Sequence, residues 1–103
     1  MRIYLSGPIS GVRDYKAKFR EAEAAVRALG HDPVNPAETF ARANLREIMR
    51  WDLFCLTECS AVYMLEGWGN SGGAKIEHAL AVYLGMDVFY QLEQIPDRTE
   101  AEI

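Results

Sequence analysis

Short apolar runs alternate along this chain with segments in which apolar residues recur every three or four positions. The apolar runs lie at residues 3–5, 61–65 and 88–90 and are typical of strands, and residues 31–35 are expected to form a further short strand. The helical spacing covers residues 15–29, 45–58 and 74–84. Because strands that alternate with helices pair in parallel, this pattern predicts an α/β fold with one parallel sheet.

The length of the chain limits this fold to a single small domain. A chain of 103 residues holds one core of two or three layers. We therefore predict a single-domain Rossmann-like (flavodoxin-like) three-layer sandwich over residues 1–95, followed by a charged tail over residues 96–103. The sheet is expected to have four to five strands in the order 2-1-3-4, numbered along the chain.

Composition narrows the kinds of partner that we expect. Eleven Lys and Arg against fifteen Asp and Glu give a net charge of −4, which disfavours binding to a nucleic acid polymer. No apolar run reaches the roughly 20 residues that a membrane span requires. The two cysteines, Cys55 and Cys59, are too few for a disulfide framework or a zinc site, so we expect them to fill space on one helix face. Together these features predict a cytoplasmic protein that binds a small molecule.

Two glycine-rich loops follow the first and third predicted strands. Ligands of open parallel sheets bind beyond the carboxyl ends of the strands, at the point where the strand order reverses. In the predicted order this point lies between strands one and three, which lead into loops 7–11 and 66–73. The third helix begins near Ser71 and Gly73, so its free backbone amides offer a place for an anion. The alternative is that these glycines only form turns.

An acidic residue, Asp52, interrupts the apolar face of the second predicted helix. The apolar residues of that face are Leu45, Ile48, Met49, Cys55, Leu56 and Cys59. A carboxylate that faces the core is costly unless it is hydrogen-bonded, paired or open to a cavity. Asp52 is therefore a candidate site residue, with a structural hydrogen bond to a neighbouring loop as the alternative.

A second acidic residue, Glu77, lies about one turn into the third predicted helix. Its side chain should lean back toward the glycine loop. The apolar stripe expected beside it consists of Ile76, Leu80, Tyr83 and Leu84. A favourable position near the positive end of the helix dipole would explain Glu77 without any function. If Glu77 and Asp52 share one crevice, the pair suits cleavage at an anomeric carbon, where positive charge develops.

Aromatic residues and one histidine complete the candidates. Tyr4 in the first strand either reaches the crevice or packs in the core, and Trp68 in the second loop either covers a base or packs against the loop. His78 is turned away from Glu77 and is expected at the surface or in an interface. Trp51 and Phe54 lie off the apolar face of their helix, so we expect them to be buried against a second copy in a homo-oligomer.

The spacing of these motifs resembles that of a known group of enzymes. The matching segments are residues 3–11, Asn35-Pro36-Ala37, Asp52 and residues 64–77. Over about residues 2–90 the chain is similar to the nucleoside 2-deoxyribosyltransferase-like superfamily. The resemblance implies that Glu77 attacks C1′ of a deoxyribosyl group, that Asp52 assists the leaving base and that Tyr4 helps to position them. We expect the substrate to contact Ser6, Gly7, Pro8, Ser10, Asn35, Trp68, Ser71 and Gly73.

Ser71 distinguishes two branches of this superfamily. Transferases that act on unphosphorylated nucleosides usually carry an acid six residues before the nucleophile, where this chain has Ser71. Relatives that hydrolyse 2′-deoxynucleoside 5′-monophosphates have serine there, and they bind the phosphate with it and a following glycine, here Gly73. Pro8 and Ser10 depart from that second branch, which has a serine and an arginine in the first loop.

The resemblance and the paired carboxylates imply one function and leave two others open. The expected reaction is cleavage or transfer of the N-glycosidic bond of a small (deoxy)nucleoside or nucleoside 5′-monophosphate, through a glycosyl ester on Glu77. This chemistry needs neither a metal nor a redox cofactor. The alternatives are a nucleotide-binding sensor or adaptor without turnover, and an enzyme that cleaves a ribosyl bond in a dinucleotide such as NAD.

Overall fold

The computed structural model describes residues 1–38 and 44–99. Four parallel strands form one sheet in the order β2-β1-β3-β4. The strands are β1 (Arg2–Ser6), β2 (Asp32–Val34), β3 (Ala61–Met64) and β4 (Asp87–Phe89). The helices are α1 (Tyr15–Ala28), α2 (Leu45–Thr57) and α3 (Gly72–Tyr83). The predicted strand order is therefore confirmed.

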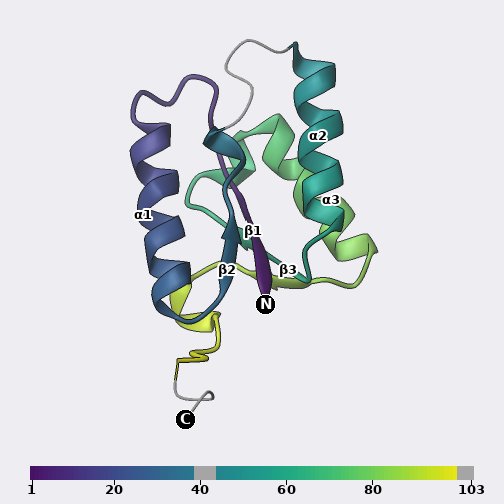
Figure 1. Cartoon of the computed structure of the whole chain (residues 1–103). Helices are drawn as coiled ribbons and strands as arrows, with labels where there is room; N and C mark the ends of the chain where they lie inside the picture. The colour runs from purple at the N-terminus through teal and green to yellow at the C-terminus, as the bar shows by residue number, and fades with distance from the viewer. Residues whose placement is uncertain (39–43, 100–103) are drawn as a thin grey trace.

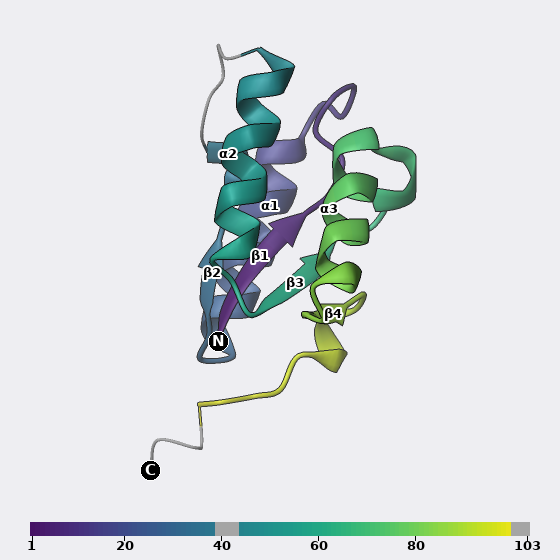
Figure 2. The same ribbon diagram turned by 90° about the vertical axis from the view of Figure 1, so that its right-hand side faces the viewer.

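The helices cover both faces of the sheet and make three layers. Figure 1 shows α1 on one side of the strands and α2 with α3 on the other side. In the view turned by 90°, α2 and α3 lie side by side across the sheet (Figure 2). The flavodoxin-like three-layer sandwich predicted from the alternating pattern is thus the observed fold, with four strands in the described residues. In that part of the chain no helix has the length and apolar character that crossing a bilayer requires.

Side chains of β1 alternate between two separate cores. Ile3 and Leu5 face α1 and pack with its buried residues Phe19 and Val26. Tyr4 faces the opposite layer and packs with residues that include Leu56 of α2 and Ala74 of α3. Because successive strand residues point to opposite faces, Ser6 points to the same face as Tyr4. The central strand therefore presents two polar hydroxyl groups to the α2–α3 layer.

Side-chain caps mark the first residues of α2 and α3. The side chain of Asn44 accepts a hydrogen bond from the Glu47 backbone amide at 2.9 Å, so the cap predicted for α2 is confirmed. Ser71 caps α3 in the same way, accepting from the Ala74 amide at 3.2 Å. As a result α3 begins at Gly72, within the segment where the sequence places the start of this helix.

The apolar stripe predicted for α3 is wrong for three of its four residues, and the fourth, Leu80, packs against the core. Ile76, Tyr83 and Leu84 are 53%, 87% and 49% exposed, whereas the buried residues of the helix are Ala74, Glu77 and Ala81. These three buried positions follow the 3–4 spacing of one helix face. Small alanines on both sides of Glu77 let α3 lie close to the sheet, and this close approach brings the carboxylate within reach of β1. In α2, Leu45 of the predicted apolar face is likewise 74% exposed.

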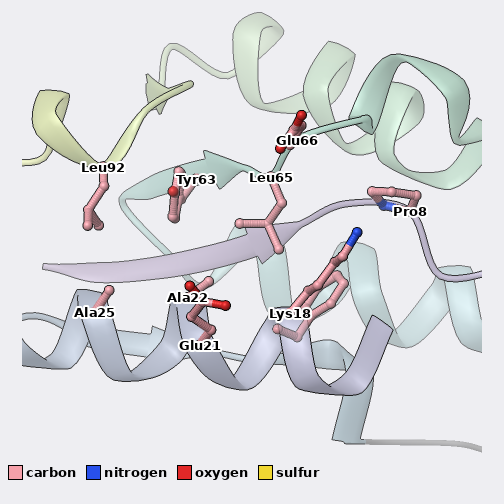
Figure 3. A pocket seen from close by; sticks show the side chains of 10 residues that line it. Pro8, Lys18, Glu21, Ala22, Ala25, Tyr63, Leu65, Glu66 and Leu92 are labelled. Atoms are coloured by element: carbon pink, nitrogen blue, oxygen red, sulfur yellow. The ribbon is translucent and has the colours of Figure 1, made fainter. Parts of the chain in front are cut away.

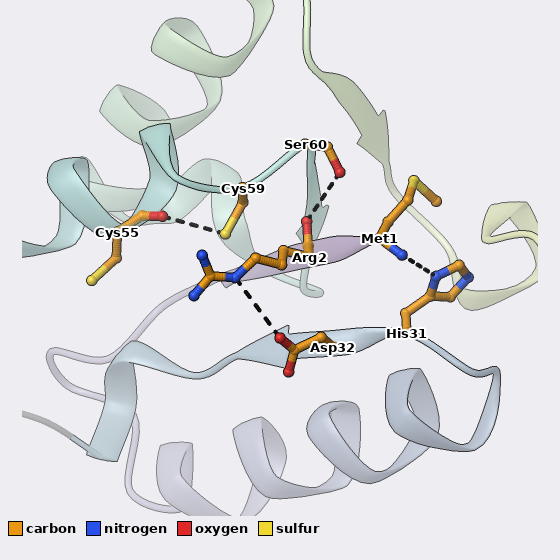
Figure 4. Close-up of polar contacts among 7 residues, drawn as sticks. All are labelled: Met1, Arg2, His31, Asp32, Cys55, Cys59 and Ser60. Carbon is orange, nitrogen blue, oxygen red and sulfur yellow. Dashed lines mark hydrogen bonds and ion pairs between the residues drawn. The ribbon is translucent and has the colours of Figure 1, made fainter.

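Polar contacts lie at the amino-terminal ends of the strands (Figure 4). The amino group of Met1 donates to Nδ1 of His31 at 3.1 Å, and Arg2 pairs with Asp32 across β1 and β2 at 3.8 Å. The Sγ atom of Cys59 donates to the backbone oxygen of Cys55 at 3.3 Å. Both cysteines are free thiols that pack in the α2–α3 core, as expected, but Cys59 lies beyond the end of α2 and not on its face. All these contacts lie at the end of the sheet opposite to the carboxyl ends of its strands.

Candidate active site

Glu77 lies at the centre of a buried hydrogen-bonded group on the α2–α3 side of the sheet. Its side chain is 5% exposed. The hydroxyl of Tyr4 donates to Oε2 of Glu77 and the hydroxyl of Ser6 donates to Oε1, both at 2.6 Å. Distances this short are typical of O–H donors to a carboxylate. Each oxygen of Glu77 therefore has its own neutral donor, and both donors come from the same face of β1.

Burial controls the protonation of Glu77. Loss of solvent raises the pKa of its carboxyl to about 7, although the hydrogen bonds from Ser6 and Tyr4 lower it and the nearby Asp52 raises it further. Within the described residues no Lys or Arg forms an ion pair with Glu77. The carboxyl is therefore held by neutral groups, and near neutral pH it exists in both protonation states.

Asp52 of α2 contributes the second carboxyl group. It is 6% exposed, so the predicted inward orientation is confirmed. Burial raises its pKa to about 6, and its charge in turn raises the pKa of Glu77 and of Tyr4. The two acids thus lie close enough to influence each other. The proximity of carboxyls from α2 and α3 agrees with the sequence, and a crevice shared by the two acids stays a prediction.

The carboxyl of Asp52 is buried but not fully enclosed. Across residues 1–38 and 44–99, every side-chain N or O atom that is closed off from solvent has a hydrogen-bond partner. Asp52 has no hydrogen bond in the same part of the chain, so its oxygens are not closed off.

Tyr4 is a fully buried donor to Glu77. Its side chain has no exposed surface, and burial together with the negative charges of Glu77 and Asp52 raises its pKa well above the usual value. The phenol therefore stays protonated throughout the physiological range and always offers its proton to Glu77. Of the two uses weighed for Tyr4, the structure shows packing, because its ring lies in the α2–α3 core and its hydroxyl binds Glu77. Contact of Tyr4 with a substrate crevice stays a prediction.

The amino-terminal end of α3 lies next to α2. A Cβ atom at Gly73 would lie 3.4 Å from the sulfur of Met49, so α2 closely approaches this turn. The hydroxyl of Ser71 accepts from the Ala74 amide and so serves as the helix cap. Phosphate binding by Ser71 and Gly73 stays a prediction.

The first loop begins with a tight contact and ends in solvent. Gly7 is buried, Pro8 is half-buried and Ser10 is exposed. Pro8 lines a cavity of about 290 Å³ between α1 and β3, together with residues that include Lys18 and Leu65 (Figure 3). This cavity lies on the α1 side of the sheet, opposite to Glu77. Substrate contacts from Gly7, Pro8 and Ser10 stay predictions.

Replacing Gly7 with Ala is expected to lower the free energy of unfolding by about 1–3 kcal/mol, because the added methyl overpacks the site. The backbone oxygen of Ser6 accepts from the Leu65 amide at 2.7 Å, and a Cβ atom on Gly7 would lie only 2.9 Å from Cβ of Leu65. Urea unfolding monitored by circular dichroism measures the effect. Gly69→Ala is the matched control, since no atom lies within 4 Å of its added Cβ. Equal stability of the two variants would contradict the prediction.

Asn35 and Trp68 use their side chains in contacts within the protein. The Asn35 amide accepts from the Ala37 backbone amide at 2.9 Å and donates to Glu23 at 3.4 Å, which ties the end of β2 to α1. Trp68 stacks on the ring of His78 with centroids 4.3 Å apart. The substrate contacts predicted for these two residues stay predictions.

His78 belongs to an aromatic cluster that the sequence did not indicate. Its Nε2 atom and the hydroxyl of Tyr90 share a hydrogen bond of 2.8 Å, and its other neighbour is Trp68. The residue is half-buried. Its contact with Trp68 places it beside the 66–73 loop, and no spacing rule in the sequence connects it to Tyr90. The cluster joins this loop to the segment that follows β4.

The aromatic pair on α2 lies at the surface of the chain. Trp51 and Phe54 are 42% and 54% exposed and stack on each other with centroids 5.6 Å apart. They face away from the sheet, as their position off the apolar face predicts. Burial of this pair against a second copy stays a prediction. In the part of the chain that is described, no group of three or more His, Cys, Asp or Glu side chains is arranged to hold a metal ion.

Solved structures with the same fold include two 2-deoxyribosyltransferases. One is from Bacillus psychrosaccharolyticus, with a TM-score of 0.68 and 21% identity over 85% of this chain and 69% of that chain. The other is from Leishmania mexicana, with a TM-score of 0.68 and 20% identity over 84% of this chain and 61% of that chain. The chain thus spans about two thirds of the length of these proteins. None of the curated proteins matches the sequence.

One family model covers most of the chain. It matches residues 1–90 and is described as a domain of unknown function (DUF4406). The matched segment contains all four strands, all three helices and both carboxyls of the site. The chain therefore belongs to this family of domains of unknown function, and its fold is that of the nucleoside 2-deoxyribosyltransferases.

Proposed function

We propose that this protein cleaves or transfers the N-glycosidic bond of a small (deoxy)nucleoside or nucleoside 5′-monophosphate. One observation carries the proposal: carboxyls from two helices, Glu77 and Asp52, converge beside the carboxyl end of β1, and two neutral donors hold one of them. Paired carboxyls are the usual apparatus for substitution at an anomeric carbon. The names of the two structural neighbours support the same class of reaction.

In the first step Glu77 is the nucleophile and Asp52 is the acid. A carboxylate oxygen of Glu77 forms a bond to C1′ while the bond from C1′ to the base nitrogen breaks. The base leaves with that electron pair and takes a proton from Asp52. Because burial raises the pKa of Asp52 to about 6, this group keeps a proton at a higher pH than an ordinary aspartate does.

In the second step the glycosyl ester on Glu77 is cleaved. Water, or the nitrogen of a second base, attacks C1′, and the bond between C1′ and the Glu77 oxygen breaks with its electron pair returning to the carboxylate. Asp52, now ionised, accepts the proton of the attacking group. Water gives hydrolysis and a second base gives transfer, with the same residues in the same roles.

The test is to incubate the protein with a panel of deoxynucleosides and their 5′-monophosphates and to measure the free base by chromatography. We expect release from at least one member, and a larger kcat/KM for monophosphates if Ser71 and the amides at the start of α3 bind the phosphate. A parallel reaction with NAD separates a dinucleotide glycohydrolase, which would release nicotinamide. Binding of a nucleotide without release of base from any substrate would favour a sensor or adaptor and contradict the proposal.

The pH profile of kcat/KM is expected to be bell-shaped, with a maximum between pH 6 and pH 7. The interacting pair holds one proton between the pKa of about 6 for Asp52 and the pKa of about 7 for Glu77. Because Glu77 has the higher pKa, the reactive form, with the proton on Asp52 and Glu77 ionised, is the minor one of the two singly protonated forms. Below this range both groups are protonated and Glu77 cannot attack, whereas above it both are ionised and Asp52 cannot protonate the base. Initial rates from pH 4 to pH 10 check the profile. A rate that keeps rising through pH 9 would contradict it.

A further inference from the structure

Ser6 is buried, and its hydroxyl binds Glu77. It is the last residue of β1, it is 1% exposed, and its hydroxyl donates to Oε1 of Glu77 at 2.6 Å. Tyr4 donates to the other oxygen at the same distance. A hydroxyl buried in a central strand needs a partner to offset its lost hydration. In this structure that partner is the proposed nucleophile.

We propose that Ser6 is a positioning residue, which orients the carboxylate of Glu77 and stabilises its negative charge when the glycosyl ester is cleaved. This inference rests on the proposed function and adds a residue to its machinery. Ser6 then acts through Glu77, in place of the direct substrate contact expected from the sequence. Its role differs from that of Tyr4 because the two hydroxyls bind different oxygens, so neither donor can replace the other.

The two chemical steps use the Ser6 hydrogen bond in opposite ways. In the first step the bond draws charge from Glu77 and makes it a weaker nucleophile. In the second step the electron pair of the breaking bond between C1′ and oxygen returns to Glu77, and a donor binds the resulting carboxylate more strongly than it binds the ester. Removing the hydroxyl should therefore slow the second step more than the first, and the glycosyl ester should accumulate.

The same hydrogen bond also affects the protonation of Glu77. The titratable groups that act on Glu77 are Tyr4 from β1 and Asp52 from α2. Tyr4 remains a neutral donor, so Ser6 is the one other hydroxyl that lowers the pKa of Glu77 in the described residues. Without it the carboxyl should hold its proton to higher pH. Loss of the Ser6 hydroxyl should therefore move the basic limb of the pH profile to higher pH, because this limb reports the loss of the last proton from Asp52 and Glu77.

The experiment compares Ser6→Ala with the wild type. Since a hydrogen bond to a charged group corresponds to about 1–2 pKa units, we expect the basic limb of kcat/KM to move up by about that much. The fraction of protein that carries a glycosyl group during turnover, measured by intact-mass spectrometry after acid quench, should rise severalfold. Ser6→Thr keeps the hydroxyl and should return both quantities toward wild type. Ser60→Ala removes an exposed hydroxyl far from Glu77 and should change neither.

A second readout separates this inference from the proposed function. Carbon-13 NMR of the glutamate carboxyls, assigned with a Glu77→Gln spectrum, gives the pKa of Glu77 without any substrate, and it should be higher in Ser6→Ala. The role of Ser6 alone is overturned if the wild type releases base but Ser6→Ala shows no shift in the pKa of Glu77, in the basic limb of the pH profile or in the glycosylated fraction. Absence of base release from the wild type overturns the proposed function and the role of Ser6 in it.

Discussion

Replacing Glu77 with Gln is expected to abolish base release and, at pH 8, to make the folded protein more stable. The amide has no charged oxygen to attack C1′, so kcat should fall by roughly 10³-fold or more, as it does when a nucleophile is removed from other covalent enzymes. The glutamine side chain has nearly the same shape and can still accept from Tyr4, so the loss would not come from unfolding.

The gain in stability follows from the raised pKa of Glu77. The carboxyl has a pKa of about 7 in the folded chain against a usual value of 4.5. Folding therefore favours the protonated form, and the stability contributed by this group is fully present below pH 4.5 and is lost as the pH rises through 7. The difference corresponds to about 3 kcal/mol at pH 8. Glutamine has no such penalty because it does not ionise.

Urea unfolding of the wild type and the Gln variant at pH 4.5 and pH 8 measures this difference. The advantage of the variant should grow by about 2–3 kcal/mol between the two values. Glu21→Gln, on the exposed side of α1, is the matched control and should alter neither base release nor the pH dependence. Unchanged base release in Glu77→Gln, or a variant that is less stable at pH 8, would contradict the assigned position and role of Glu77.

Replacing Asp52 with Asn is expected to slow release of ordinary bases by roughly 10²–10⁴-fold, the usual contribution of a general acid. The loss should depend on the leaving group. A nucleoside of 7-methylguanine already carries positive charge on its base and departs without a proton, so its release should be much less affected. A purely structural role of Asp52 would slow both substrates equally.

The comparison of the two substrates is therefore the decisive measurement for Asp52. Initial rates with a deoxyguanosine substrate and its 7-methyl derivative give the ratio for the wild type and for Asp52→Asn. The variant should increase the preference for the methylated substrate by at least about tenfold, a change of about 1.4 kcal/mol in relative barrier. Asp87→Asn removes an exposed carboxylate from β4 and should leave the ratio unchanged. An unchanged ratio in Asp52→Asn would remove its role as the acid.

The strand order and the two acids were predictable because each depends on a strong local pattern. Short apolar runs between helical segments permit few arrangements other than a parallel sheet. Asp52 stands out because a carboxylate interrupts an apolar helix face, and burial confirms its inward orientation. The position of Glu77 was also correct, although three of the four residues predicted beside it in an apolar stripe are exposed. Large apolar residues on α3 were expected inside, whereas the close helix–sheet contact admits mainly alanines.

The hydrogen bonds to Glu77 were not predictable from periodicity. Every residue of β1 after Arg2 is buried, so alternation in the sequence does not reveal which side chains face α1 and which face α3. The only available signal was Ser6 itself, a polar residue that ends a strand buried on both faces and therefore needs a partner. The contact between His78 and Tyr90 was likewise hidden, because it joins segments whose relative position depends on the whole fold.

Trapping of the glycosyl ester tests most directly whether Glu77 is the nucleophile of the site. A substrate analogue with fluorine at C2′ destabilises the positively charged transition states and should slow cleavage of the ester, so that the intermediate persists. Intact-mass spectrometry followed by peptide mapping should then show one added sugar, located on Glu77. Base release from the analogue with an unmodified protein, or with the sugar on another residue, would contradict the account.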